Sequence, residues 1–93
     1  MIEVKKTKAI KSTTNVSGVL VQTTEDKWYA VTMYMPTRNP WFLRATPSTS
    51  TGRPSDTEIF VKKCNSKPEI EEGVDMLIRV LNGEEPARDR MAF

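Results

Sequence analysis

The chain of 93 residues contains no histidine and a single cysteine, Cys64. Without histidine it lacks the side chain that most often serves as a general base or a metal ligand. One cysteine excludes both an internal disulfide and a thiolate zinc cluster. No apolar run approaches the length of a membrane-spanning helix, and no signal-peptide core opens the sequence. We therefore expect a small cytoplasmic domain with no cofactor and no metal.

Composition indicates a folded chain with an uneven charge distribution. Hydrophobic residues make up 38% of the sequence and the formal net charge is +2, which is too apolar and too weakly charged for a disordered protein. Residues 1–63 carry ten Lys/Arg against five Asp/Glu, whereas residues 64–93 carry four against seven. The basic first part predicts attraction to phosphate or to an acidic protein surface.

β-Strand patterns occupy the first two-thirds of the chain. Runs rich in Val, Ile, Thr and aromatic residues alternate with turn-forming residues, and the polar segment 23–27 is short enough to join two strands as a hairpin. Segment 47–56 is rich in Pro, Ser and Thr and reads as a mobile loop. The expected strands are 2–10, 16–22, 28–35, 41–46 and 57–64.

One amphipathic helix is expected after the strands. Its apolar residues recur with the spacing of a single helix face: Ile70, Val74, Leu77, Ile78 and Leu81.

Both ends of this helix carry local signals. Ser66 and Glu69 have the spacing of a capping box, with Pro68 in the first turn. Asn82-Gly83 is a typical stop, and Gly73 inside the helix indicates close approach to the sheet.

The fold class expected from these elements is α+β. An antiparallel sheet of four or five strands would carry one C-terminal α-helix packed on one face, forming a single domain over residues 1–83. Residues 84–93 read as a flexible tail.

Catalysis is not expected. Cys64 precedes the helix, whose N-terminus can activate a thiol, but the chain offers no histidine as its base, and a small apolar residue ending a strand explains it better. Glu71 and Asp75 lie one helical turn apart without supporting ligands, which is typical of a solvated helix face. A thiol function at Cys64 is therefore the weakest of the functions considered.

A binding surface is better supported. Alternation along 28–35 places Trp28 and Tyr34 opposite the apolar face that the helix would cover, together with Phe60 and Lys62. The adjoining segment 36–44 sets two arginines around two aromatics, and Trp, Tyr and Arg dominate binding hot spots. Alternatively, segment 41–46 folds over the sheet as a second small core. The expected partner-binding residues are Trp28, Tyr34, Arg38, Trp41, Phe42, Arg44, Phe60 and Lys62.

A resemblance accompanies these strands. Gly18-Val19 opens one strand and Lys27-Trp28-Tyr29-Ala30 opens the next, which resembles the DNA-binding modules at the amino end of some tyrosine integrases and in plant ethylene-response factors. The resemblance covers residues 18–82 and implies three antiparallel strands followed by a helix, with the sheet placed in the DNA major groove. Segment 36–57 departs from that pattern.

Two functions follow from the sequence. The first is a non-enzymatic protein-binding module with an acidic partner, in the class of small inhibitors that phages and mobile elements use to occlude a protein. The second is nucleic-acid binding through the basic, aromatic-bearing sheet face. The aromatic face could also form the seam of a homodimer.

Overall fold

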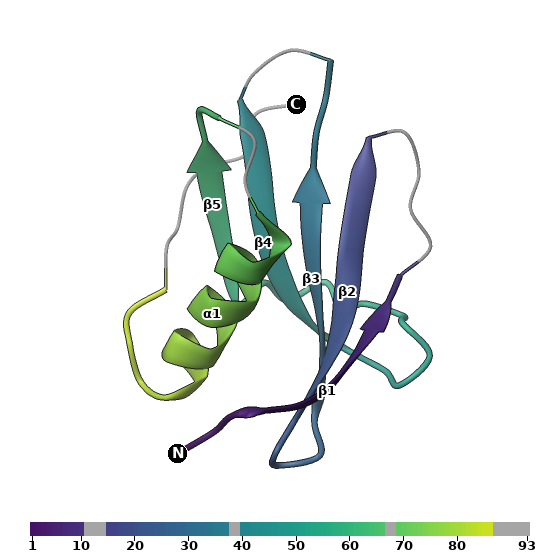
Figure 1. The fold of residues 1–93 in the computed structure, drawn as a ribbon, viewed down its shortest axis with the longest axis vertical. Coiled ribbons are helices and arrows are strands. Elements are labelled where there is room, and N and C mark those ends of the chain that lie inside the picture. Colours follow the sequence, from purple (N-terminus) through teal and green to yellow (C-terminus); the bar gives the residue numbers. More distant parts are fainter. Residues whose placement is uncertain (11–14, 38–39, 67–68, 87–93) are drawn as a thin grey trace.

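The structure is a computed structural model that describes residues 1–10, 15–37, 40–66 and 69–86 (Figure 1). It contains five strands and one helix, and the helix packs on one face of the sheet. Their bounds are β1 Val4–Ala9, β2 Val16–Thr23, β3 Trp28–Tyr34, β4 Trp41–Ser48, β5 Phe60–Cys64 and α1 Ile70–Leu81.

The five strands form one antiparallel meander in the order β1-β2-β3-β4-β5. The expected α+β class is confirmed, with five strands where the integrase-like modules have three. The 23–27 hairpin is also confirmed, with Val19 opposite Val31 and Gln22 opposite Trp28. Segment 41–46 is part of the sheet and not a separate core, because β4 pairs with both β3 and β5.

β4 continues two residues beyond its expected end. Pro47 lacks an N–H and was expected to end the strand, yet it lies opposite Tyr29 in the β3–β4 ladder. Its carbonyl accepts a hydrogen bond of 2.8 Å from the Ser55 backbone N–H. Proline lacks a backbone N–H donor, and the backbone of Pro47 is directed toward Ser55 rather than toward β3. The missing donor therefore does not interrupt the pairing of β4 with β3.

The core lies between α1 and the facing side of the sheet. Its fully buried members include Val31, Leu43 and Leu77, one from each of β3, β4 and α1. Gly73 allows this contact, because a Cβ on Gly73 would lie 2.7 Å from Val31 Cγ1 and 3.4 Å from Leu43 Cδ2. The close approach expected from Gly73 is confirmed.

The N-terminal end of α1 differs from the expected capping box. The helix starts at Ile70, its N-cap is Glu69, and no side chain caps it. Ser66 lies too far upstream to bond the first-turn amides, so the expectation for Ser66 and Glu69 is wrong. The predicted position of Pro68 lies outside the described residues.

The C-terminal end of α1 follows the expected stop. Gly83 has φ +105°, and the N–H groups of Gly83 and Glu84 donate to the carbonyls of Val80 and Arg79 at 3.0 Å each. This is the Schellman arrangement, which needs a left-handed residue after the cap. Asn82 also accepts from the Ile2 N–H at 2.8 Å and donates to the Ile2 carbonyl at 2.9 Å, so the N-terminal segment is fastened beside the helix end (Figure 1).

Only part of the predicted tail is described. Residues 84–86 follow the helix end, and residues 87–93 lie outside the described residues.

Gly73→Ala tests the helix–sheet contact. Alanine gains up to ~1 kcal/mol in helix propensity, whereas overpacking against Val31 costs ~1–3 kcal/mol because a β-branched strand residue has little room to turn. We expect a net loss of about 1 kcal/mol in the free energy of unfolding, measured by urea denaturation. The control Asp75→Ala, at an exposed position of the same helix, should change it by less than about 0.5 kcal/mol. A Gly73→Ala variant more stable than the parent would contradict the contact.

Candidate functional site

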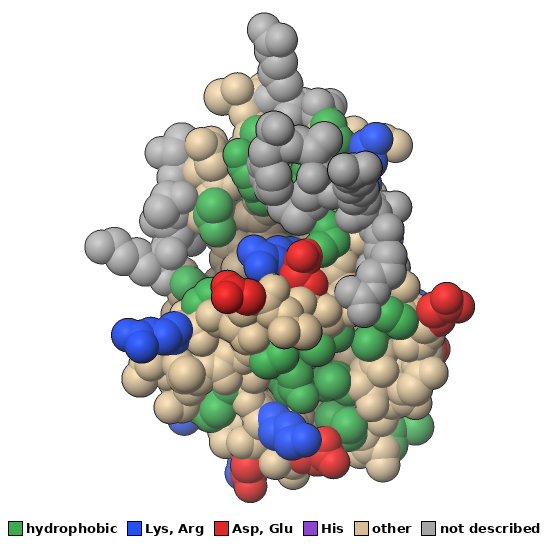
Figure 2. Space-filling model, turned by 180° about the vertical axis from the view of Figure 1, so that it is seen from behind, with side chains coloured by type: hydrophobic (Ala, Val, Ile, Leu, Met, Phe, Trp, Pro, Cys, Tyr) green, Lys and Arg blue, Asp and Glu red, His purple; other side chains and the backbone are tan. Residues whose placement is uncertain are grey.

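The strand register divides the side chains of the sheet between two faces. Residues directly opposite each other across a ladder point to the same side, so the side chains can be followed from strand to strand. Val31 contacts the helix, so its partners Val19 and Ala45 share the helix-covered face. Trp28, Tyr34, Phe42 and Arg44 consequently lie on the other side of the sheet, which we call the open face. Figure 2 shows the molecule from behind the view of Figure 1, on the side away from the helix.

Phe60 and Lys62 were expected on the open face, and this placement is wrong. Phe60 lies opposite Ala45 and Lys62 opposite Leu43, so both point to the helix-covered face. Phe60 is fully buried and belongs to the core cluster. The open face instead receives Val61 of β5. Because Phe60 and Val61 are both apolar, a period of two could not tell which one faces the core.

Trp41 also lies away from the open face. Trp41 lies opposite Cys64 on the helix-covered side of the sheet, and its indole N–H donates to the Pro36 carbonyl at 3.4 Å. The predicted site residue Arg38 lies outside the described residues.

The connection between β4 and β5 folds over the centre of the open face. A Cβ on Gly52 would lie 3.5 Å from Leu20 Cδ1. The two arms of the β4–β5 connection are joined by the Ser48–Pro54 bridge and by a 3.1 Å hydrogen bond from the Thr49 N–H to the Arg53 carbonyl. The segment expected to be a mobile loop is therefore held by backbone hydrogen bonds.

Arg44 forms an ion pair with Glu58 of this connection. Its Nε lies 3.6 Å from Glu58 Oε2, and both atoms are shielded from solvent. The guanidinium therefore has a carboxylate partner within its own chain, which lowers its value as a contact for a partner's carboxylate.

The aromatic side chains of the open face do not form one patch. Trp28 and Tyr34 stand at opposite ends of β3, about 20 Å apart at the usual rise of a strand. Phe42, opposite Tyr34, is only 4% exposed. The expected contact residues that the structure describes are thus dispersed, and Trp28 is the half-exposed aromatic that shares a row with a lysine.

The Trp28 end of the open face combines an aromatic ring with a basic stripe. A row runs across the sheet from Lys6 through Gln22 and Trp28 to Ser48, each opposite the next. Lys8 lies one step along β1 on the same face and is also exposed. We call Lys6, Lys8, Gln22 and Trp28 the basic row site.

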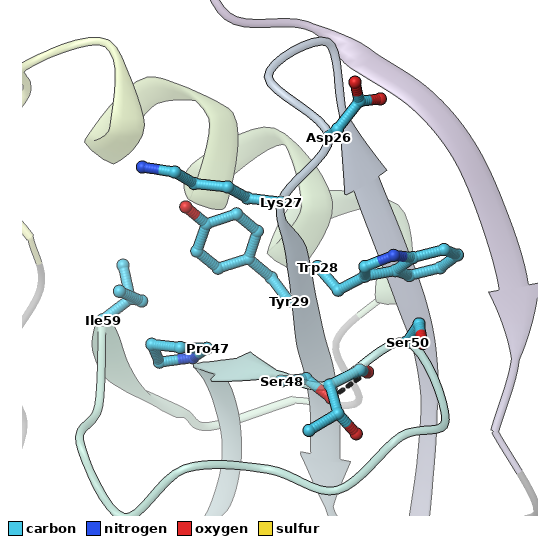
Figure 3. Close-up of a pocket in the computed structure, with 9 residues that line it drawn as sticks. Asp26, Lys27, Trp28, Tyr29, Pro47, Ser48, Ser50 and Ile59 are labelled. Carbon is cyan, nitrogen blue, oxygen red and sulfur yellow. Dashed lines mark hydrogen bonds between the residues drawn. The ribbon is translucent and has the colours of Figure 1, made fainter.

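A hollow of about 660 Å³ opens beside Trp28 at this end of the sheet (Figure 3). The indole lies on one side of β3, and the rings of Tyr29 and Pro47 lie on the other side with Ile59. Ser48 at the end of β4 and the following Thr49 and Ser50 also line the hollow. The hollow is therefore lined by both apolar and polar side chains, as binding surfaces commonly are.

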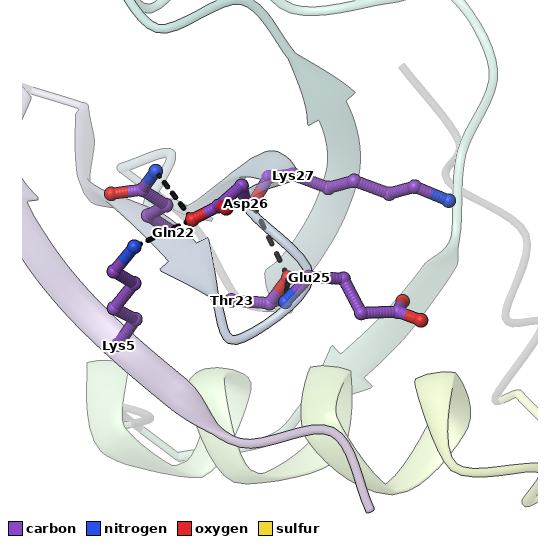
Figure 4. Close-up of polar contacts among 6 residues, drawn as sticks. All are labelled: Lys5, Gln22, Thr23, Glu25, Asp26 and Lys27. Carbon is purple, nitrogen blue, oxygen red and sulfur yellow. Dashed lines mark hydrogen bonds and ion pairs between the residues drawn. The ribbon is translucent and has the colours of Figure 1, made fainter.

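Asp26 in the β2–β3 turn pairs with a lysine of β1 near this hollow (Figure 4). Asp26 adopts φ 62°, which aspartate tolerates, and its carboxylate lies 2.6 Å from Lys5 Nζ and 3.4 Å from Gln22 Nε2. Lys5 is the extra residue where the β1–β2 register shifts, which directs it toward the turn. Lys5 is thus paired with a carboxylate, whereas Lys6 and Lys8 make no ion pair with any described residue.

Sequence reasoning missed the lysines and the glutamine of this site. From the sequence, Lys6 and Lys8 count only toward the basic first part of the chain, and Gln22 is only the end of an expected strand. Their spacing of two residues on β1 was visible, but their alignment with Trp28 depends on the shifted register at Lys5.

The described residues offer no metal site and no membrane-crossing helix. Nowhere in them do three or more His, Cys, Asp or Glu side chains gather as metal ligands would. Within the same residues, no helix has both the length and the apolar character that a membrane span requires. Comparison of the chain with family models, with curated proteins and with solved structures finds no match.

The raised pKa of Tyr29 predicts that the folded protein loses stability at alkaline pH. Burial, and then the Glu25 carboxylate, raise the pKa of Tyr29 above its ordinary value of 10.0. Below pH 10 the phenol is neutral in the folded and unfolded chains. Above it the unfolded chain releases the proton first, so stability falls until pH passes the folded pKa.

Thermal melts between about pH 9 and about pH 12 measure this effect against Tyr29→Phe, which has no such proton. We expect the parent protein to lose stability relative to Tyr29→Phe above pH 10. Parallel curves would contradict the prediction, because the two proteins differ only in the Tyr29 hydroxyl.

Proposed function

We propose that the protein is a non-enzymatic protein-binding module that uses the basic row site to cover an acidic surface of its partner. The observation that carries the proposal is the row itself, in which half-exposed Trp28 stands between Ser48 and Gln22 with Lys6 beyond. A tryptophan at a hollow provides a large rigid contact area, and flanking lysines provide charge complementarity. A small cytoplasmic inhibitor of the phage or mobile-element class, acting by occlusion, would need no more than this.

Nucleic-acid binding is the second candidate, favoured by the pairing of an aromatic ring with lysines. The small number of unpaired basic side chains in the basic row site favours a protein partner over a nucleic acid. Arg44 is held by Glu58 and Lys5 by Asp26, which leaves Lys6 and Lys8 as the lysines of the basic row site. Two lysines suffice for a cluster of partner carboxylates, whereas nucleic-acid binders contact phosphates along a longer basic track.

Trp28→Ala tests the proposal, with Trp41→Ala as its matched control on the helix-covered face. A partner identified by affinity capture from the source cell is titrated against the parent and both variants by calorimetry. We expect Trp28→Ala to weaken binding by about tenfold or more, and Trp41→Ala to leave it within about threefold. Equal weakening by both variants would contradict the assignment of Trp28 as the contact.

Fluorescence anisotropy with single- and double-stranded oligonucleotides at two salt concentrations tests the alternative. The protein-binding proposal predicts no binding at low salt. Binding that falls steeply with salt and is lost in Trp28→Ala would instead support the nucleic-acid function, because phosphate contacts release counterions.

A further inference from the structure

Within the part of the chain that the structure describes, no strand pairs with the outer edge of β1. β1 is the first strand in the sheet order, and all six of its residues are exposed. α1 packs over β2, β3 and β4, so β1 projects beyond the helix (Figure 1). The free backbone groups of an edge strand are a template for strand addition.

The hydrogen-bond alternation identifies which groups are free. The Ile10 N–H donates to the Gly18 carbonyl at 3.1 Å, and Ala9 lies opposite Val19. In an antiparallel ladder, residues that bond to the partner strand alternate with residues that point away from it. Lys6 and Lys8 therefore bond toward β2, and the N–H and C=O groups of Thr7 and Ala9 point outward.

The side chains of β1 determine what kind of strand fits there. Lys6 and Lys8 project to the open face at adjacent same-side positions, about 7 Å apart. Thr7 and Ala9 present small side chains to the opposite face. An added strand would place alternate residues beside each set, and acidic residues beside the lysines would be favourable. A second copy of β1 would bring lysines against lysines, which is unfavourable.

We propose that β1 receives an extended segment of the partner protein as a sixth strand, with acidic residues at alternate positions facing Lys6 and Lys8. This inference rests on the proposed function and specifies its partner: a chain end or loop that alternates acidic with apolar or β-branched residues. Main-chain hydrogen bonds at Thr7 and Ala9 supply affinity, and the two lysines supply selectivity.

A synthetic peptide of roughly eight residues, alternating glutamate with valine, serves as the probe. The control peptide replaces each glutamate with lysine and keeps the backbone unchanged. In ¹⁵N spectra of the full chain we expect the glutamate peptide to shift the Thr7 and Ala9 amides and to slow their hydrogen exchange. The lysine peptide should do neither. Shifts confined to residues outside β1, or no binding at millimolar peptide, would overturn the proposal.

Thr7→Pro removes the outward N–H without removing a bond to β2, and proline is tolerated at such an edge position. Thr7→Val keeps the N–H and is the matched control. We expect Thr7→Pro to weaken binding of the glutamate peptide by about tenfold, and Thr7→Val to bind it as tightly as the parent protein does. Equal affinity of the proline and valine variants, with both folded, would show that charge alone attracts the peptide, and would overturn strand addition.

A charge exchange provides a readout that does not depend on proline. The double variant Lys6→Glu, Lys8→Glu should lose the glutamate peptide and gain the lysine peptide. Unchanged selectivity would overturn the role of the lysines.

Failure here can be distinguished from failure of the proposed function. If Trp28→Ala weakens binding of the native partner and Thr7→Pro does not, the partner binds the basic row site without adding a strand. In that case the strand-addition proposal alone is overturned.

Discussion

Contact between α1 and the middle of the sheet governs the arrangement of every surface on this protein. Gly73 brings the helix backbone against Val31 and Leu43 so closely that a methyl group would collide. That contact assigns one face of β3 and β4 to the core, and the strand period of two then assigns the alternate residues to the open face. The outward position of Trp28 is a consequence of the same packing, because Tyr29 and Val31 are turned inward.

A second constraint acts on the open face. Among the described residues, the one helix covers only one side of the five-stranded sheet, and a chain of this size has little material for the other side. The β4–β5 connection lies over Leu20, and Glu58 from it engages Arg44. This covering separates Trp28 from Tyr34 and leaves the basic row site at one end. Lys5 pairs with Asp26, whereas Lys6 and Lys8 of the basic row site make no ion pair with any described residue.

Much of the fold could be read from local patterns. The α+β class, the hairpin around residues 23–27, the apolar face of the helix and its stop at Gly83 depend on neighbours in sequence. The capping box was wrong because Ser66 has the right residue type but lies one turn before the helix start at Ile70. The site was less predictable. Phe60 was placed on the wrong face because Phe60 and Val61 satisfy the strand pattern equally well.

The sequence by itself determined the elements, their order, the lack of histidine-based chemistry and the basic character of the first part of the chain. Those features are local or additive, so no tertiary contact is needed to derive them. Only the tertiary structure decided which aromatics remain accessible, which arginine is already paired and which lysines stand beside Trp28. These depend on register across four strands and on where the β4–β5 connection folds, and long-range pairing determines both.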